Sequence, residues 1–361
     1  MDMKNKILAA ILTVTLAGVM TACGNNGGGG NADASVTQSS KSTSDSGTKS
    51  EDTMLGADSA TLRLKVGTTT APEGHYVKGL QEMQKLLEEY SDGEMTLDIY
   101  PNSQLGNERD MMENVGMGVQ EMCLISTGPI PNFVSDFAVL DLPYLFEDEQ
   151  HAYEVLDGEI GTSLLGQLES QGIRGVGFWE NGFREVTNDK KEIKTPEDLK
   201  GMKIRTMENS VHMATYQTLG ATATPMAWSE IFTALQQGTV DGQENPIAII
   251  ESAKVYEVQK YVSMIDIFYS PCVLMIAQST YDGFTDAQKE AFDKAAEEAK
   301  DYQREYSSSY NKEAIENMKE AGVTVTEVDK EVWKSAADAV YDQLDSLKLN
   351  KELVEKIQSS N

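Results

Sequence analysis

Short apolar runs alternate with helical repeats along most of the chain. Residues 61–66 alternate apolar and polar side chains, as half-buried strands do, and residues 73–90 carry apolar side chains at helical spacing. Another strand is predicted at residues 95–100, a helix at residues 108–115 and a third strand at residues 122–125. This order of elements predicts a mostly parallel sheet with helices on both faces.

The same alternation returns in the middle of the chain. Strands are predicted at residues 173–178, 202–206 and 221–224, and helices at residues 210–219 and 229–237. Ser229 stands at the start of the last of these helices and is a candidate N-cap. The chain therefore contains two halves, each built from strands and helices in alternation.

The last third of the chain follows another pattern. Residues 285–321 read as one long helix, which Thr285 and Gln288 begin with a capping-box sequence and Gly322 ends. Two halves with a long packing helix predict an α/β protein with two lobes that close on a ligand in the cleft between them.

The first residues carry the features of an export signal. Lys4 and Lys6 precede an apolar run at residues 7–19, which is too short for a comfortable membrane span. Small residues then lead to Cys23 in a pattern that resembles a bacterial lipobox, although Met20 stands where leucine is usual. We expect residues 1–23 to be a lipoprotein signal peptide with Cys23 lipidated. Ordinary cleavage and a transmembrane anchor are the alternatives.

A polar segment follows the cysteine. Residues 24–58 are mostly Gly, Asn, Ser, Thr and Asp, a composition that predicts a disordered tether. The glycine run at residues 27–30 lacks the Lys-Ser/Thr of a phosphate-binding loop, which argues against a nucleotide site. Residues 59–361 are then the folded domain.

Charge and cysteine content exclude several classes of function. The chain has 58 acidic and 30 basic residues, a formal net charge of -28, which argues against nucleic acid as a partner. Cys123 and Cys272 lie in apolar stretches and are predicted to be separate buried thiols, with a disulfide as the alternative. Two isolated cysteines and three scattered histidines predict no metal site, and no cofactor is expected.

Two arginines stand out in so acidic a chain. Arg205 comes at the end of a predicted strand, where a guanidinium can meet a carboxylate through two parallel hydrogen bonds. Arg184 could reach the same point if its strand lies beside that of Arg205. For either arginine, a structural salt bridge is the alternative.

Two further segments are candidates for a binding site. Trp228 lies where a loop turns into a helix and could form an aromatic wall, although a core position is equally consistent. Asn245 precedes Pro246, which favours extended backbone; its amide could donate to a ligand or hold Arg205, or the loop could satisfy only its own backbone. The sequence shows no nucleophile elbow and no supported Ser/His/Asp set, so we do not expect an enzyme.

Several long motifs in order give a resemblance to a known family. The chain resembles the DctP-type solute-binding proteins of tripartite ATP-independent (TRAP) transporters, over about residues 62–345. The motifs that carry the resemblance are residues 100–109, 141–146, 182–184, 195–205, 219–221, 225–230 and 234–246.

The resemblance implies a fold like that of periplasmic binding proteins, with two lobes that are discontinuous in sequence and a long helix spanning both. It implies that Arg205 clamps the ligand carboxylate, with Arg184 near it. It also implies that Asn245 lies beside that carboxylate and that Trp228 walls it in.

The first-lobe positions implied by the resemblance are Thr69, Glu108 and Ser126, which would contact the rest of the ligand. Residues 262–268 lack the histidine that many relatives carry there, so the ligand's identity does not transfer. A dicarboxylate, a sugar acid such as a uronate and a keto acid all stay open.

The implied partners are a small organic acid anion and two membrane subunits, one small and one large, that take up the ligand. The chain would act outside the cytoplasm, lipid-anchored to the outer face of the membrane. A surface lipoprotein that presents its ligand to a signalling receptor is the alternative, and an exported enzyme or a purely structural lipoprotein are further ones.

Overall fold

The computed structural model describes residues 52–360. The predicted signal peptide, Cys23 and most of the predicted tether lie outside the described residues. Met54 exchanges two backbone hydrogen bonds with Ile99, at 3.0 and 2.9 Å, so ordered chain begins before residue 59. Within the described residues, no helix combines the length and the apolar character that crossing a membrane requires.

The first lobe is built on three parallel strands, in the order β2-β1-β3. Their apolar side chains pack against α1, whose buried face includes Leu80, Met83 and Leu87. The predicted strands and helices of this half are confirmed, and their observed ends differ from the predicted ones by no more than two residues. The elements are β1 (Leu62–Gly67), α1 (His75–Tyr90), β2 (Met95–Tyr100), α2 (Glu108–Gly116) and β3 (Met122–Ser126).

The second lobe repeats the arrangement with shorter strands. Three strands lie in the order β7-β5-β6, and β8 and β10 pair at another edge. Its elements are β5 (Lys203–Thr206), α5 (Ser210–Thr218), β6 (Thr222–Pro225), α6 (Ile231–Gln236), β7 (Gly242–Pro246), α7 (Ile247–Ser252), β8 (Tyr261–Met264) and β10 (Thr324–Glu327).

The long strand β4 (Ile173–Asn188) joins the lobes, and its antiparallel pairing makes the sheet mixed rather than mostly parallel. β4 pairs antiparallel with β9 (Tyr269–Ala277) in the first lobe, and with β7 and β8 in the second. The sequence predicted only its first six residues, because polar residues interrupt the apolar pattern after Phe178. Gly182 lies beside a register shift between β4 and β9 and has φ 126°, a conformation that glycine adopts readily. The strand therefore continues through this irregularity.

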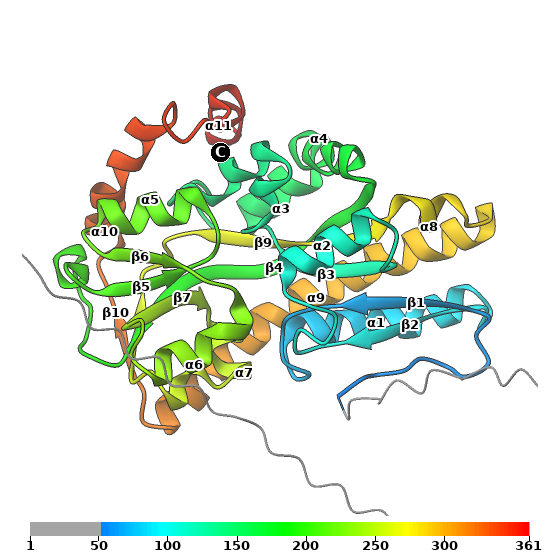
Figure 1. Ribbon diagram of the computed structural model, residues 1–361, viewed down its shortest axis with the longest axis horizontal. Helices are drawn as coiled ribbons and strands as arrows, with labels where there is room; N and C mark the ends of the chain where they lie inside the picture. The colour runs from blue at the N-terminus through cyan, green and yellow to red at the C-terminus, as the bar shows by residue number, and fades with distance from the viewer. Residues whose placement is uncertain (1–51, 361) are drawn as a thin grey trace, which may run out of the picture. The chain divides into compact units, whose positions relative to one another are not determined.

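One helix contacts both lobes, as predicted (Figure 1). The capping box of Thr285 and Gln288 begins α9 (Asp286–Glu320). Phe292 and neighbouring alanines of its first half pack in the core around α1, whereas Met318 of its second half packs with α7 residues. Between them, Gln303 accepts from the Glu180 N–H at 2.8 Å and donates to its carbonyl at 2.7 Å, which ties β4 to the middle of α9.

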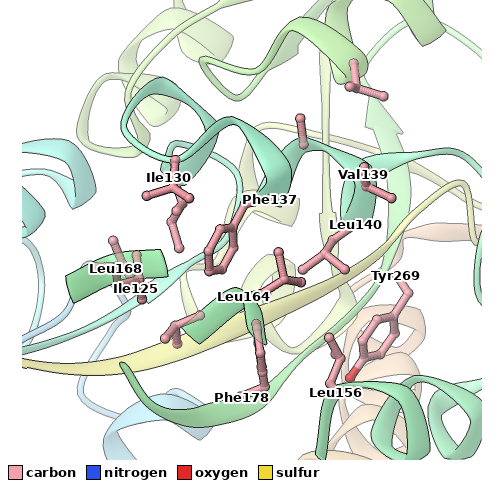
Figure 2. Packing of buried hydrophobic residues seen from close by; sticks show 14 of the residues in the cluster. Ile125, Ile130, Phe137, Val139, Leu140, Leu156, Leu164, Leu168, Phe178 and Tyr269 are labelled. Carbon is pink, nitrogen blue, oxygen red and sulfur yellow. The ribbon is translucent and has the colours of Figure 1, made fainter. Parts of the chain in front are cut away.

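The largest core cluster lies on the other face of the first-lobe sheet (Figure 2). Phe137, Phe146, Phe178 and Tyr269 contribute its buried aromatic side chains, and the C-terminal segment adds Val354 and Ile357. Cys123 and Cys272 are both buried and free, so the predicted separate thiols are confirmed. The remaining helices are α3 (Glu149–Asp157), α4 (Glu159–Gln167), α8 (Gln278–Asp282), α10 (Lys330–Ala337) and α11 (Lys351–Gln358).

Candidate functional site

A pocket of about 330 Å³ lies where the two lobes and β4 meet. Its lining comes from the segment after β1, the starts of α1 and α2, the end of β3, the middle of β4, the ends of β5 and β7, helix α7, and the segments that follow β5 and β6. All seven residues predicted to bind a ligand line it, which are Thr69, Glu108, Ser126, Arg184, Arg205, Trp228 and Asn245.

Arg205 brings a buried positive charge to this pocket. Its Nε and Nη2 donate to the Met226 carbonyl at 2.9 and 2.6 Å, and the guanidinium forms no ion pair with any residue between 52 and 360. Burial lowers the pKa of Arg205 to about 10, although the negative charge of Glu244 acts to raise it. A buried cation without a counterion is costly, and an anion in the pocket would relieve that cost.

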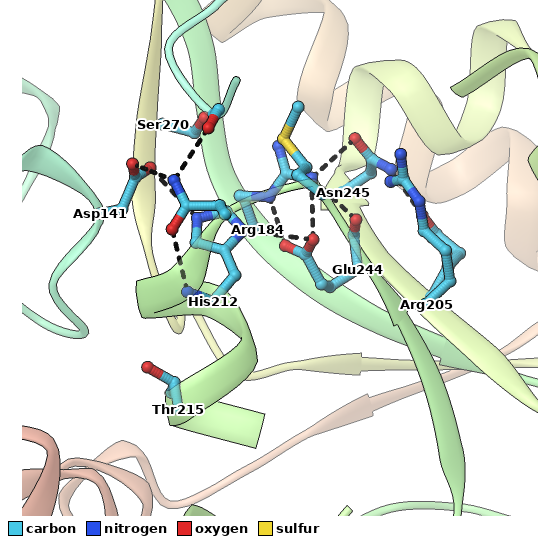
Figure 3. Close-up of polar contacts among 12 residues, drawn as sticks. Asp141, Arg184, Arg205, His212, Thr215, Glu244, Asn245 and Ser270 are labelled. Atoms are coloured by element: carbon cyan, nitrogen blue, oxygen red, sulfur yellow. Dashed lines mark hydrogen bonds and ion pairs between the residues drawn. The ribbon is translucent and has the colours of Figure 1, made fainter. Parts of the chain in front are cut away.

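Arg184 differs from Arg205 because its charge is already paired. Its Nε and Nη2 donate to the two carboxylate oxygens of Glu244, and Nη2 also donates to the Glu244 carbonyl at 2.9 Å (Figure 3). Arg184 is 1% exposed and Glu244 is fully buried. The salt bridge that the sequence left open for either arginine is therefore present at Arg184.

The two arginine strands are not neighbours, which corrects one expectation. β7 lies between them: Arg184 on β4 is opposite Pro246, and Arg205 on β5 is opposite Gln243. Both side chains nevertheless line the pocket, together with Asn245 of β7.

Asn245 is fixed by Arg184 rather than by Arg205. Its amide oxygen accepts from Arg184 Nη2 at 3.1 Å, and its amide nitrogen donates to Gln243 Oε1 at 2.6 Å. One N–H of the amide is left for a ligand oxygen. The backbone is extended as predicted, but it forms strand β7 and not a loop.

Trp228 is half-buried at the rim of the pocket. It opens a short 3-10 turn, Trp228–Glu230, that leads into α6. The proposed cap at Ser229 is wrong: Glu230 holds the N-cap position of α6 without a side-chain hydrogen bond, and Ser229 is exposed. The 3-10 turn ends at Glu230, so Ser229 lies one residue before the N-cap position of α6.

Sequence reasoning missed a buried histidine behind Arg184. His212 Nε2 lies 3.1 Å from Asp141 Oδ1, its Nδ1 lies 3.6 Å from Glu244 Oε1, and its ring stacks on Phe268 at 4.2 Å. Burial lowers the pKa of His212, but the two carboxylates outweigh it and the net direction is upward. Burial would raise the pKa of Glu244, but Arg184 and His212 lower it to about 2.

The first lobe presents a carboxylate to the pocket. Glu108 is the first residue of α2, and it accepts from Ser126 through the backbone N–H at 2.8 Å and the hydroxyl at 3.0 Å. Burial raises the pKa of Glu108, while the Ser126 donors and the two arginines act in the opposite direction. No group of three His, Cys, Asp or Glu side chains within residues 52–360 could hold a metal ion.

The sequence and the fold are similar to those of known transport proteins. Residues 66–346 match the family described as bacterial extracellular solute-binding protein, family 7 (DctP). The 2,3-diketo-L-gulonate-binding periplasmic protein YiaO of Escherichia coli is 36% identical over 278 residues, which cover 77% of this chain and 85% of the relative. The C4-dicarboxylate-binding periplasmic protein DctP of Rhodobacter capsulatus is 33% identical, over 78% and 86% of the two chains.

A solved structure gives the same result for the fold. The TRAP periplasmic solute-binding protein of a Polaromonas species, bound to D-erythronate, is 40% identical with a TM-score of 0.79, and the match covers 82% of this chain and 98% of that one. These proteins bind and deliver substrates for transport and are not enzymes. The chain therefore belongs to the extracytoplasmic solute-binding proteins of family 7, the DctP receptors of TRAP transporters.

Proposed function

We propose that this receptor captures a small organic acid anion, a dicarboxylate or a sugar acid, and that Arg205 clamps its carboxylate. The observation that carries the proposal is the buried Arg205 guanidinium, which lines the pocket between the lobes without an ion pair among the described residues. A carboxylate can accept two parallel hydrogen bonds from such a group.

The neighbouring residues have distinct proposed roles. Asn245 donates its remaining N–H to the same carboxylate, Trp228 excludes water at the rim, and Arg184 holds Asn245 in position. Because both lobes and β4 line the pocket, a bound anion contacts both lobes and stabilises the closed arrangement. Closure also strengthens each hydrogen bond by excluding water.

The named ligands of the relatives support an organic acid. One is named for 2,3-diketo-L-gulonate, one for C4-dicarboxylates, and the Polaromonas protein holds D-erythronate. All three ligands carry a carboxylate, although their bodies differ. Delivery to a small and a large membrane subunit follows from the TRAP family assignment.

Thermal unfolding of residues 52–361 with a panel of organic acids tests the ligand class. An acid at ~1,000 times its dissociation constant is expected to add about 4 kcal/mol to the free energy of unfolding. Sugar acids, dicarboxylates and keto acids form the panel, with a neutral sugar alcohol as the control. Stabilisation by the sugar alcohol, or by no acid at all, would argue against an organic acid receptor.

We also propose that Cys23 carries the lipid that anchors the protein to the outer face of the membrane. The support is the export signal and the small residues before Cys23. In the Cys23→Ser variant of the full chain, incorporation of labelled palmitate is expected to disappear and the protein is expected to leave the membrane fraction. Equal labelling of wild type and variant would refute the anchor at this residue.

A further inference from the structure

The charges around the pocket limit how many carboxylates a ligand can bring. The basic residues that line it are Arg184, which is paired with Glu244, and Arg205, which forms no ion pair within residues 52–360. Arg109 lies at an adjoining opening and is paired with Glu113 at 3.2 Å. One carboxylate of a ligand can therefore be matched by Arg205, and no second unpaired cation from residues 52–360 lines the pocket.

The first-lobe side of the pocket already holds an acidic side chain. Glu108 is half-buried there, and its two oxygens accept from the N–H and the hydroxyl of Ser126. These donors favour the ionised carboxylate, against the upward effect of burial on the pKa of Glu108. Glu108 interacts electrostatically with Arg205 without forming an ion pair. A second ligand carboxylate placed beside the Glu108 carboxylate would form a like-charge pair inside the pocket, which is unfavourable.

A second acceptor lines the same pocket. Asn181 on β4 is 2% exposed, its amide nitrogen donates to Ser270 Oγ at 3.3 Å, and its amide oxygen has no hydrogen-bond partner among the described residues. Leaving a buried acceptor unsatisfied costs free energy, so a ligand that donates to it gains affinity. A carboxylate offers only acceptors, whereas a hydroxyl group can donate.

We infer that Glu108, together with Asn181, determines specificity, and that the ligand is a hydroxylated monocarboxylate, that is, a sugar acid and not a dicarboxylate. The inference rests on the proposed function, since Arg205 must hold the ligand's carboxylate. The hydroxyl groups of the ligand then donate to Glu108 and to the Asn181 amide oxygen.

Acids of four carbons separate charge from hydroxyl content at nearly constant size. Isothermal titration calorimetry compares D-erythronate (one carboxylate, three hydroxyls), butyrate (one carboxylate), succinate (two carboxylates) and L-malate (two carboxylates, one hydroxyl), with D-galactonate and D-galacturonate as longer sugar acids. At least one of the three sugar acids is expected to bind a hundredfold or more tightly than succinate, L-malate and butyrate.

The Glu108→Gln variant tests the residue itself. We expect sugar acid affinity to fall at least tenfold and succinate affinity to stay equal or rise, because the amide removes the charge and an acceptor. Glu197→Gln, at an exposed carboxylate that does not line the pocket, is the matched control and should leave both affinities unchanged. Dicarboxylate binding as tight as sugar acid binding in the wild type would overturn the inference and leave the proposed function standing. Binding of no acid would overturn the proposed function and the inference with it.

Discussion

Replacement of Arg205 by methionine is expected to abolish ligand binding and to leave the ligand-free protein at least as stable as the wild type. The guanidinium is buried and has only the Met226 carbonyl as a hydrogen-bond acceptor in residues 52–360. Two charge-assisted hydrogen bonds to a ligand carboxylate are worth ~1.5–3 kcal/mol each, so affinity should fall at least a hundredfold. Removing a buried cation without a counterion also removes its desolvation cost from the free protein.

Two measurements on the same preparation check this expectation. Calorimetry should show the loss of affinity for the acid identified in the panel, and urea unfolding without ligand should show an unchanged or higher midpoint. Arg109→Met is the matched control, since Arg109 lies at the mouth of the pocket but is half-exposed and paired with Glu113. A large loss of stability in Arg205→Met without ligand would show that Arg205 is part of the scaffold instead.

Much of the fold could be predicted because its signals are local. The strands and helices of both halves follow the spacing of nearby apolar residues, and the capping box of Thr285 begins α9 as the sequence indicated. β4 could not be predicted at full length, because what holds it after Phe178 is pairing with β7 and β9. Those partners lie far along the chain and leave no mark in the local pattern.

The candidate site, too, could be predicted only where its signals are local. Arg205 could be singled out from its place at a strand end, and all seven candidates line one pocket. The difference between the two arginines could not be predicted, since it depends on Glu244, which lies sixty residues after Arg184. His212 gave no signal at all: it is a single histidine on a helix face, and only packing brings it to Asp141.

Loss of the Glu244 carboxylate is expected to destabilise the protein strongly, in contrast to the loss of Arg205. Glu244→Gln leaves Arg184 fully buried without a counterion and takes from His212 one of its two carboxylate neighbours. Breaking a buried ion pair by removing one partner costs about 3–5 kcal/mol. Because Asn245 is held by Arg184, ligand affinity should fall as well, even though Glu244 does not line the pocket.

The pH dependence of the free energy of unfolding distinguishes the contribution of the Glu244 charge from that of the side chain's shape. The pKa of Glu244 is lowered from 4.5 to about 2, so its contribution to stability is complete above about pH 4.5 and is lost as the pH falls toward 2. Urea unfolding of the ligand-free proteins should therefore show a smaller gap between wild type and Glu244→Gln at pH 3 than at pH 7.

An exposed carboxylate gives the matched control for this prediction. Glu197 is 70% exposed and pairs with Lys200 at 3.5 Å, so Glu197→Gln should change the free energy of unfolding by less than about 1 kcal/mol. A loss in Glu244→Gln no larger than this control, or a gap that does not narrow in acid, would mean that the buried pair with Arg184 does not stabilise the folded state.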